Sequence, residues 1–372
     1  MLRSELANVD EFRADLIRGI YQHIYQKFVE DNFDVQRFSY DGVDRSGVLN
    51  TQGNANYLNF LLANLDSFFA ASLLFNDQAS RDLFRQLIKY RCLGHPHLRI
   101  REDMTWSEIK SMIDRAKTYE VGPSQIPFSG AFGALAHHEG IPTEERPISL
   151  DVWNVNLAYG LGRGDHRQYY FSRDGVRIQP AEGDYLIDGG ACFGDTSIFF
   201  SCSAGPSGRV FAFEPLPEHI NAIVHNIDQN LFEDRVFVVP TGLGEFTNQV
   251  QTIDSSLSKV ANPGFSISNR EDAVPVLAID DFLSLQKIEK MDFIKMDVEG
   301  FELKALKGAS STIAKFRPKL AISLYHKPED FFEIPIYLKS YYPFYRLYLD
   351  HYTIHAEETV LYAIADPVYP CR

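Results

Sequence analysis

Residues 185–196 read Tyr-Leu-Ile-Asp-Gly-Gly-Ala-Cys-Phe-Gly-Asp-Thr and carry the clearest structural signal in the chain. A short apolar run ends at Asp188, and three glycines follow before the pattern becomes helical. Glycine lets the backbone approach a ligand with no side chain in the way, and the free N–H groups of a new helix attract a carboxylate or a phosphate. The stretch therefore predicts a strand, a ligand-binding turn and the start of a helix.

The spacing of the glycines separates two classes of cofactor. A dinucleotide-binding turn needs Gly-x-Gly-x-x-Gly, but Ala191 stands where the second glycine is required. The sequence instead gives Asp-x-Gly-x-x-x-Gly from Asp188 to Gly194. A carboxylate is poorly placed beside a pyrophosphate and well placed beside the ammonium of an amino acid, which S-adenosylmethionine carries. S-adenosylmethionine is thus the favoured cofactor, while an NAD-type oxidoreductase, a non-catalytic binding protein and a plain glycine-rich turn remain alternatives.

Apolar runs and helical patterns alternate on the C-terminal side of this turn. Strands are predicted at 185–187, 210–213, 236–239, 293–296 and 320–324, and helices at 217–230, 302–313 and 331–340. Continuous apolar strands that alternate with helices are typical of a parallel sheet covered on both faces. The predicted fold is α/β with a doubly wound, Rossmann-like sheet, which the segments 345–349 and 360–365 close as an antiparallel pair.

Two further segments lie where such a sheet binds a nucleotide. Glu214 ends the second strand, and a carboxylate at that position accepts hydrogen bonds from both ribose hydroxyls. Thr241 and Gly242 follow the third strand, where the adenine is expected. The complete set predicted to bind the cofactor is Asp188, Gly189, Gly190, Ala191, Gly194, Thr196, Glu214, Thr241 and Gly242.

The N-terminal part of the chain has a different pattern. Apolar residues recur at helical spacing through residues 1–120, and residues 122–147 are rich in glycine and proline, which predicts a linker. A second loop is expected at 255–268. The predicted domains are a mainly helical region over 1–150, ending in the linker, and a cofactor-binding domain over 151–372.

The composition excludes several classes of partner. The net charge is −14, with 36 Lys and Arg against 50 Asp and Glu, and no basic patch stands out. Non-specific binding to nucleic acid or to an anionic membrane needs such cations, so neither partner is expected. The first residues lack the apolar core of a secretion signal and no apolar run is long enough to span a bilayer, which favours the cytoplasm. The paired His137 and His138 lack metal-binding spacing and are expected at the surface.

Three motifs resemble the FkbM family of methyltransferases. They are 185–191 (Tyr-Leu-Ile-Asp-Gly-Gly-Ala), 210–215 (Val-Phe-Ala-Phe-Glu-Pro) and 294–302 (Ile-Lys-Met-Asp-Val-Glu-Gly-Phe-Glu). The resemblance extends over about residues 165 to 365. It implies a class I methyltransferase that acts chiefly on oxygen, often on hydroxyls of sugars, polyketides or other secondary products. It also implies that Asp188, Gly190 and Gly194 hold the amino acid end of the cofactor and Glu214 its ribose.

Three side chains are expected near the reacting atoms. Asp297 ends the fourth strand, Glu299 follows it, and His326 follows the fifth strand, so all three are expected to share one pocket at the carboxyl edge of the sheet. One of them acts as general base, with His326 favoured because it titrates near neutral pH. Alternatively, Asp297 and Glu299 bind magnesium or manganese, which acidifies the acceptor hydroxyl. Glu302 is expected to be structural, as a carboxylate in the first turn of a helix.

The partners that this chemistry predicts are few. The acceptor is expected to be a small molecule or a glycan. The N-terminal helices are expected either to contact the acceptor or to form the surface of a homodimer.

Overall fold

The computed structural model describes residues 8–24, 29–32, 51–130, 132–163, 167–247, 250–253, 265–266 and 273–368. The chain forms two compact units. The first combines Met1–Ser111 with Leu324–Leu361, and the second combines Met112–Ser323 with Tyr362–Arg372. The N-terminal segment of the first unit ends at Ser111 and this unit also includes a C-terminal segment, so the units differ from the predicted division near residue 150.

The first unit is mainly helical, as predicted for the N-terminal region. Its elements are α1 (Val9–Ile24), α3 (Thr51–Ala63), α4 (Leu65–Ser72), α5 (Gln78–Leu93), α13 (Asp330–Tyr341) and β17 (Tyr345–His351). Asp77 caps α5 by accepting a hydrogen bond from the Ser80 N–H at 2.6 Å. The helix then buries Phe84, which contacts the ring of Phe331 on α13. This contact shows why the C-terminal helix belongs to the same core as the N-terminal ones.

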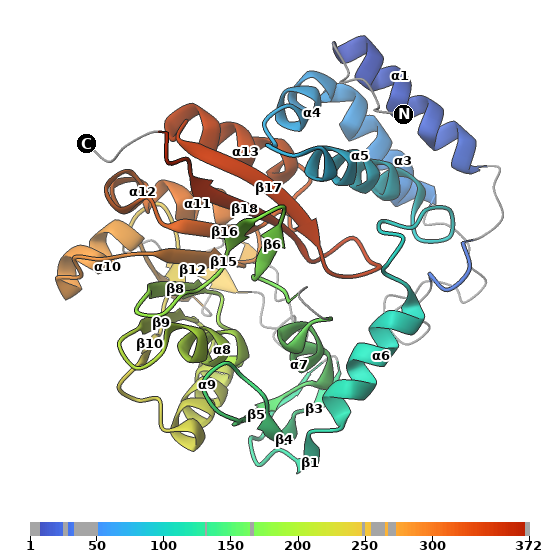
Figure 1. Ribbon diagram of the computed structural model, residues 1–372. Coiled ribbons are helices and arrows are strands. Elements are labelled where there is room, and N and C mark those ends of the chain that lie inside the picture. The colour runs from blue at the N-terminus through green and yellow to red at the C-terminus, as the bar shows by residue number, and fades with distance from the viewer. Residues whose placement is uncertain are drawn as a thin grey trace. The chain divides into compact units, whose positions relative to one another are not determined.

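The second unit is built on five parallel strands, shown in Figure 1. They are β8 (Tyr185–Gly189), β9 (Arg209–Phe213), β10 (Val236–Val239), β15 (Phe293–Met296) and β16 (Lys319–Ser323). Their order in the sheet is β10-β9-β8-β15-β16, so the order in which strands are added reverses between β8 and β15, which themselves run parallel. The α/β prediction and each of its five strands are confirmed.

The last two strands of the chain are neighbours. The boundary between the units falls within β18 (Thr359–Ala365), which lies next to β17. Only residues 352–358 connect β17 to β18, which is too short for the crossover that parallel neighbours need. The predicted antiparallel pair is therefore present at the end of the chain.

Helices connect the parallel strands of the second unit. They are α8 (Asp195–Ala204), α9 (Pro217–Asn230), α10 (Ile279–Gln286), α11 (Glu302–Lys307) and α12 (Ser310–Phe316). Right-handed crossovers that run in opposite directions from β8 and β15 place α8 and α9 on one face and α11 and α12 on the other. The single helix predicted over 302–313 is two helices. They break at Gly308, where a Cβ would lie 2.0 Å from the carbonyl oxygen of Gly244.

The predicted linker over 122–147 is wrong for most of its length. After α6 (Trp106–Lys117), the strands β1 (Glu120–Pro123), β4 (Ala136–Ile141) and β5 (Ile148–Val152) form an antiparallel sheet. The short strands β2 (Ser129–Gly130) and β3 (Gly133–Ala134) form a second pair, and α7 (Asn154–Leu161) follows. The glycines mark positive φ angles at 133 and 140, at a turn and at an irregular register, and do not mark a break in structure.

The same sheet corrects the expectation that His137 and His138 lie at the surface. His138 is fully buried, with Nδ1 3.2 Å from the Leu150 carbonyl and Nε2 2.9 Å from Asn154 Oδ1. His137 is half-buried against Asp151 on the neighbouring strand. Both rings therefore hold the small sheet together.

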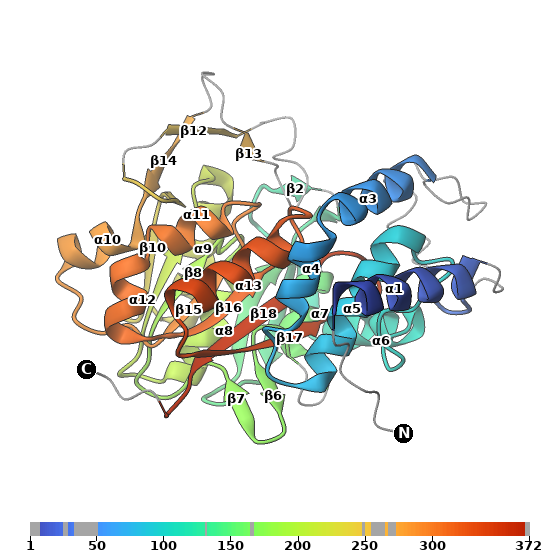
Figure 2. The same ribbon diagram turned by 90° about the horizontal axis from the view of Figure 1, so that it is seen from above.

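Two smaller groups of strands complete the second unit. The hairpin of β6 (Phe171–Arg173) and β7 (Val176–Ile178) is visible in Figure 2. A four-stranded group contains β11 (Gly242–Leu243), β12 (Val250–Ile253), β13 (Phe265–Ser266) and β14 (Ala273–Leu277). Apart from β13, the loop predicted at 255–268 lies outside the described residues. Among the helices that the structure describes, none combines the length and the apolar character needed to cross a membrane.

Candidate functional site

The glycine loop between β8 and α8 is anchored to the end of the neighbouring strand. The N–H groups of Gly190 and Ala191 both donate to the carbonyl oxygen of Phe213, at 2.9 and 3.0 Å. Gly190 and Gly194 have φ angles of +73° and +81°, which a residue with a side chain rarely adopts. The loop is therefore a fixed turn at the carboxyl edge of the sheet, where the sequence predicts it.

Gly190 also allows a close contact between two parts of the backbone. A Cβ at this position would lie 1.8 Å from the carbonyl oxygen of Asp297, which follows β15. The Asp297 N–H in turn donates to the carbonyl oxygen of Gly189 at 3.0 Å. The glycines thus bring the loop after β8 against the loop after β15, in addition to any ligand that they accommodate.

Asp188 is fully buried and ion-paired. Its Oδ1 lies 2.9 Å from Lys295 Nζ, its register partner on β15, and its Oδ2 accepts a hydrogen bond from Ser197 Oγ at 2.6 Å. Lys295 Nζ also donates to the carbonyl oxygen of Gly190 at 2.7 Å. Asp188 therefore acts on the glycine loop through Lys295 and Ser197, and its predicted contact with the amino acid end of a cofactor stays a prediction.

The charges around Lys295 favour a cationic ligand. Burial by itself lowers the pKa of Lys295, but Asp188, Asp297 and Asp195 together raise it above its ordinary value. Asp195, the first residue of α8, has its pKa raised to about 6, first by burial and then by the neighbouring Asp188. A carboxyl group whose pKa is raised in this way is stabilised by an additional positive charge. The ammonium and sulfonium of S-adenosylmethionine are such charges.

Glu214 is held at the end of β9 beside the same loop. Its Oε2 accepts a hydrogen bond from the Cys192 N–H at 2.9 Å, and its Oε1 accepts one from the Leu216 N–H at 3.0 Å. The ring of His219 lies 3.5 Å from the same carboxylate. The position and the fixed orientation suit the predicted ribose contact, which stays a prediction.

Thr241 and Gly242 lie beyond β10, at the same edge of the sheet. The Thr241 N–H donates to the Val239 carbonyl, and Gly242 begins β11. The Thr241 hydroxyl oxygen is buried and makes no hydrogen bond within the part of the chain that the structure describes. A buried polar atom of this kind suits a ligand with hydrogen-bonding edges, such as the adenine predicted here.

Asp297 opens a tight turn between β15 and α11. Glu299 and Gly300 both have positive φ angles, +53° and +87°. Glu302 is buried in the first turn of α11 and accepts a hydrogen bond from the Val298 N–H at 2.9 Å. This bond is the structural role expected for Glu302. Asp297 accepts a hydrogen bond at Oδ2 from the hydroxyl of Tyr169 at 2.8 Å.

Comparison with known proteins identifies this part of the chain. A family model described as the methyltransferase FkbM domain matches residues 188–353. These residues therefore resemble the FkbM methyltransferases, and we refer to the matched stretch as the FkbM domain. The match begins at the aspartate that ends β8 and includes the Asp297 turn.

Two relatives of the FkbM domain add detail. The hexuronic acid methyltransferase AglP of Haloferax volcanii is 26% identical over 145 residues, which are 38% of this chain and 57% of that protein. The chain thus matches little more than half the length of this relative. The crystal structure of methyltransferase FkbM from Methylobacillus flagellatus KT has a TM-score of 0.51 and 18% identity, covering 93% of this chain and 76% of that one. At this identity the likeness establishes the class I methyltransferase fold.

The remaining predicted residues of the FkbM domain are less closely defined. Thr196 is half-buried in the first turn of α8. His326 follows β16 and is half-buried, but it belongs to the first unit, whereas Asp297 and Glu299 belong to the second. A pocket that joins all three, and a metal ion bound by Asp297 and Glu299, stay predictions.

Lys295, Asp195, Ser197 and Tyr169 belong to the site but were not predicted. Lys295 stands inside the motif 294–302, and Asp195 and Ser197 follow the glycine loop, so these three had a signal nearby in the sequence, whereas Tyr169 precedes the matched stretch. Lys295 faces Asp188 because the register of β8 and β15 pairs them. Neither motif alone predicts that register. Tyr169 reaches Asp297 from a segment outside the parallel sheet.

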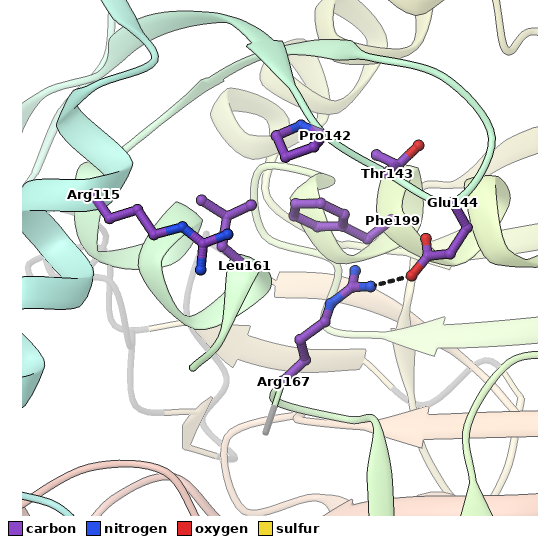
Figure 3. A pocket seen from close by; sticks show the side chains of 7 residues that line it. All are labelled: Arg115, Pro142, Thr143, Glu144, Leu161, Arg167 and Phe199. Atoms are coloured by element: carbon purple, nitrogen blue, oxygen red, sulfur yellow. Dashed lines mark hydrogen bonds and ion pairs between the residues drawn. The ribbon is translucent and has the colours of Figure 1, made fainter. Parts of the chain in front are cut away.

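The second unit also contains a cavity of about 290 Å³ away from the predicted residues (Figure 3). It is lined by Arg115, Pro142, Thr143, Glu144, Leu161, Arg167 and Phe199. Arg167 is already engaged, because its guanidinium pairs with Glu144 and lies over the ring of Phe199. None of these lining residues belongs to the glycine loop.

Proposed function

We propose that this protein is an S-adenosylmethionine-dependent methyltransferase that methylates a hydroxyl group of a sugar acid or a related small molecule. The observation that carries the proposal is the arrangement of three features at one edge of the sheet: the fixed glycine loop, the oriented carboxylate of Glu214 and the Asp297 turn packed against Gly190. In a doubly wound sheet this edge, at the reversal of strand order, is where ligands bind.

The residues present fit the cofactor. Glu214 would accept hydrogen bonds from the ribose hydroxyls, and the buried Thr241 hydroxyl would face the adenine. The Asp195 carboxylate, with its raised pKa, supports a cationic amino acid end next to the start of α8. Bound S-adenosylmethionine would supply a methyl group on a sulfonium, which becomes a neutral thioether when the acceptor oxygen takes that methyl.

The chain itself must orient the acceptor and remove its proton. Asp297 is the group best supported for this role in the second unit, because its backbone contacts the glycine loop and its carboxylate is held in one orientation. Glu299 and His326 remain the other candidates for the base. The proposal does not depend on a divalent cation at Asp297 and Glu299.

The acceptor class rests on the relative that acts on a hexuronic acid. A uronic acid offers several hydroxyls and one carboxylate, and methylation of a hydroxyl would give an ether. Glucuronic acid and galacturonic acid are therefore the first acceptors to test, with mass spectrometry to detect the gain of a methyl group. A cytoplasmic location, a homodimer and the absence of nucleic acid or membrane partners remain predictions of the sequence.

Calorimetric binding of S-adenosylhomocysteine tests the cofactor assignment. Glu214→Gln removes the charge that accepts the ribose hydrogen bonds, so we expect binding to weaken about 10- to 100-fold, equivalent to about 1.5–3 kcal/mol. Glu218→Gln, an exposed glutamate one turn further along the chain, is the matched control and should bind as the unaltered protein does. Failure of the unaltered protein to bind, or binding of NAD in its place, would reject the proposal in favour of an oxidoreductase or a non-catalytic protein.

A further inference from the structure

Tyr169 adopts a backbone conformation that is unusual for a large side chain. It lies just before β6 with a φ angle of +66°, in the left-handed region that favours glycine. Its N–H donates to the hydroxyl of Tyr362 on β18 at 3.0 Å, which holds the backbone in place. Strained residues of this kind persist where the surrounding structure requires the side chain to point in one direction.

The side chain of Tyr169 points into the candidate site. Its hydroxyl donates to Asp297 Oδ2 at 2.8 Å, and its ring lies 5.3 Å from the ammonium of Lys295. Lys295 is the partner of Asp188 at the end of β8. A single buried tyrosine thus connects the acid that follows β15 to the ion pair that supports the glycine loop.

This connection fixes more than the position of the Asp297 backbone. The contact with Gly190 already places the peptide of Asp297 against the glycine loop. The carboxylate would still rotate about its side-chain torsions unless something held it. The hydrogen bond at Oδ2 restricts that rotation and so contributes to the direction of Oδ1.

We propose that Tyr169 is a positioning residue for methyl transfer, which holds the Asp297 carboxylate so that it faces the transferred methyl group and the acceptor hydroxyl. The inference rests on the proposed function. The acceptor hydroxyl gives its proton to Asp297 while its oxygen forms a bond to the methyl carbon, and the carbon–sulfur bond breaks with its electron pair remaining on sulfur. Tyr169 touches neither reactant in this step and acts only through Asp297.

A structural role for the ring alone is the competing interpretation. The ring packs edge-on against Phe200 and under Lys295, so removing it would disturb the core whatever the hydroxyl does. Tyr169→Phe keeps the ring and removes only the hydroxyl. Tyr170→Phe is a matched control, because Tyr170 is equally buried and its hydroxyl bonds to Ser203 at 2.9 Å, away from Asp297.

The experiment compares two ligands that differ at the transferred methyl group. S-adenosylhomocysteine has no group there, whereas sinefungin carries an ammonium that a nearby carboxylate would bind. We expect Asp297→Asn to reduce the preference for sinefungin over S-adenosylhomocysteine about tenfold or more, and Tyr169→Phe to reduce it about three- to tenfold. The affinity for S-adenosylhomocysteine itself should stay the same in Tyr169→Phe, and both affinities should stay the same in Tyr170→Phe.

A double variant shows whether the two residues act together. If Tyr169 acts through Asp297, Tyr169→Phe combined with Asp297→Asn should show the same preference as Asp297→Asn alone. An unchanged preference in Tyr169→Phe, an unchanged preference in Asp297→Asn, or additive losses would each overturn the inference. Failure of the unaltered protein to bind S-adenosylhomocysteine at all would instead reject the proposed function. That outcome differs from the three above, because it is seen before any variant is compared.

Discussion

Two buried aspartates in the second unit are neutralised in different ways. Asp188 pairs with Lys295, whose ammonium keeps its charge across the physiological pH range. Asp151 on β5 is as deeply buried, yet its Oδ2 lies 2.9 Å from His137 Nδ1 and 3.1 Å from His225 Nε2. Histidine titrates near neutral pH. The first aspartate is therefore held by a permanent charge, and the second in part by His137, whose charge depends on pH.

The difference matches the structural roles of the two aspartates. Asp188 supports the glycine loop, whose geometry must stay the same for a ligand to bind. Asp151 joins the small antiparallel sheet to α9, since His137 lies on β4 and His225 on α9. A permanent charge is placed where the geometry must be constant, and a pH-dependent one where two layers are joined.

The largest loss of stability is expected when the permanent charge is removed. Lys295→Met leaves Asp188 buried without its cation, which should lower the free energy of unfolding by about 3–5 kcal/mol. Lys290→Met is the control, because Lys290 is half exposed beside Asp292 and its loss should cost less than about 1 kcal/mol. Denaturant unfolding measures both. Equal effects of the two substitutions would contradict the role given to Lys295.

Removing the second aspartate should have a smaller effect. Asp151→Asn keeps the size of the side chain but loses the charged partner of His137, His225 and Gln229. We expect the free energy of unfolding to fall by about 1–3 kcal/mol, measured in the same way. Asp228→Asn, at an exposed position of α9, is the control and should change stability by less than about 0.5 kcal/mol. A loss as large as that of Lys295→Met would remove the distinction between the two sites.

The smallest expected effect concerns pH. Burial alone would lower the pKa of His137, but hydrogen bonds to Asp151 and Glu139 raise it above the ordinary value of 6.5. A raised histidine pKa gives stability that is complete below pH 6.5 and is lost as the pH rises through the higher folded value. The free energy of unfolding, measured from pH 5.5 to 8.5, should therefore decline as the pH rises, and this decline should be absent in His137→Gln. An identical decline in that variant would show that another group causes it.

The parallel sheet and the glycine loop were predictable because their signals are local. Each of the five parallel strands is an apolar run next to a helix in the sequence, and the acids Asp188, Glu214 and Asp297 stand at the ends of these runs. The segment 122–147 was not predictable in the same way. Its strands are short, and its glycines and prolines are typical of loops even though their backbone pairs within a sheet.

The candidate site was predictable in its parts but not in its connections. The acids appear in motifs, yet the cation that neutralises Asp188 comes from the register between two strands more than a hundred residues apart. The tyrosine that holds Asp297 comes from a segment with no regular pattern. Such pairs depend on which distant segments come together in the fold, and composition and periodicity do not predict this.

The side chain of Asn226 on α9 connects the glycine loop to β5. This connection bears on how much of the chain must be present for the loop to fold. Its amide nitrogen donates both to the Phe193 carbonyl in the glycine loop and to the Asp151 carbonyl on β5, and its Oδ1 accepts from the Asp151 N–H. The loop that opens the FkbM domain is thus tied through one amide to a strand that ends 36 residues before the match begins. A shortened chain that started at residue 165 would lack Asp151 and so remove two of the hydrogen bonds of this amide, so the unit that must fold together is larger than the stretch that the family model matches.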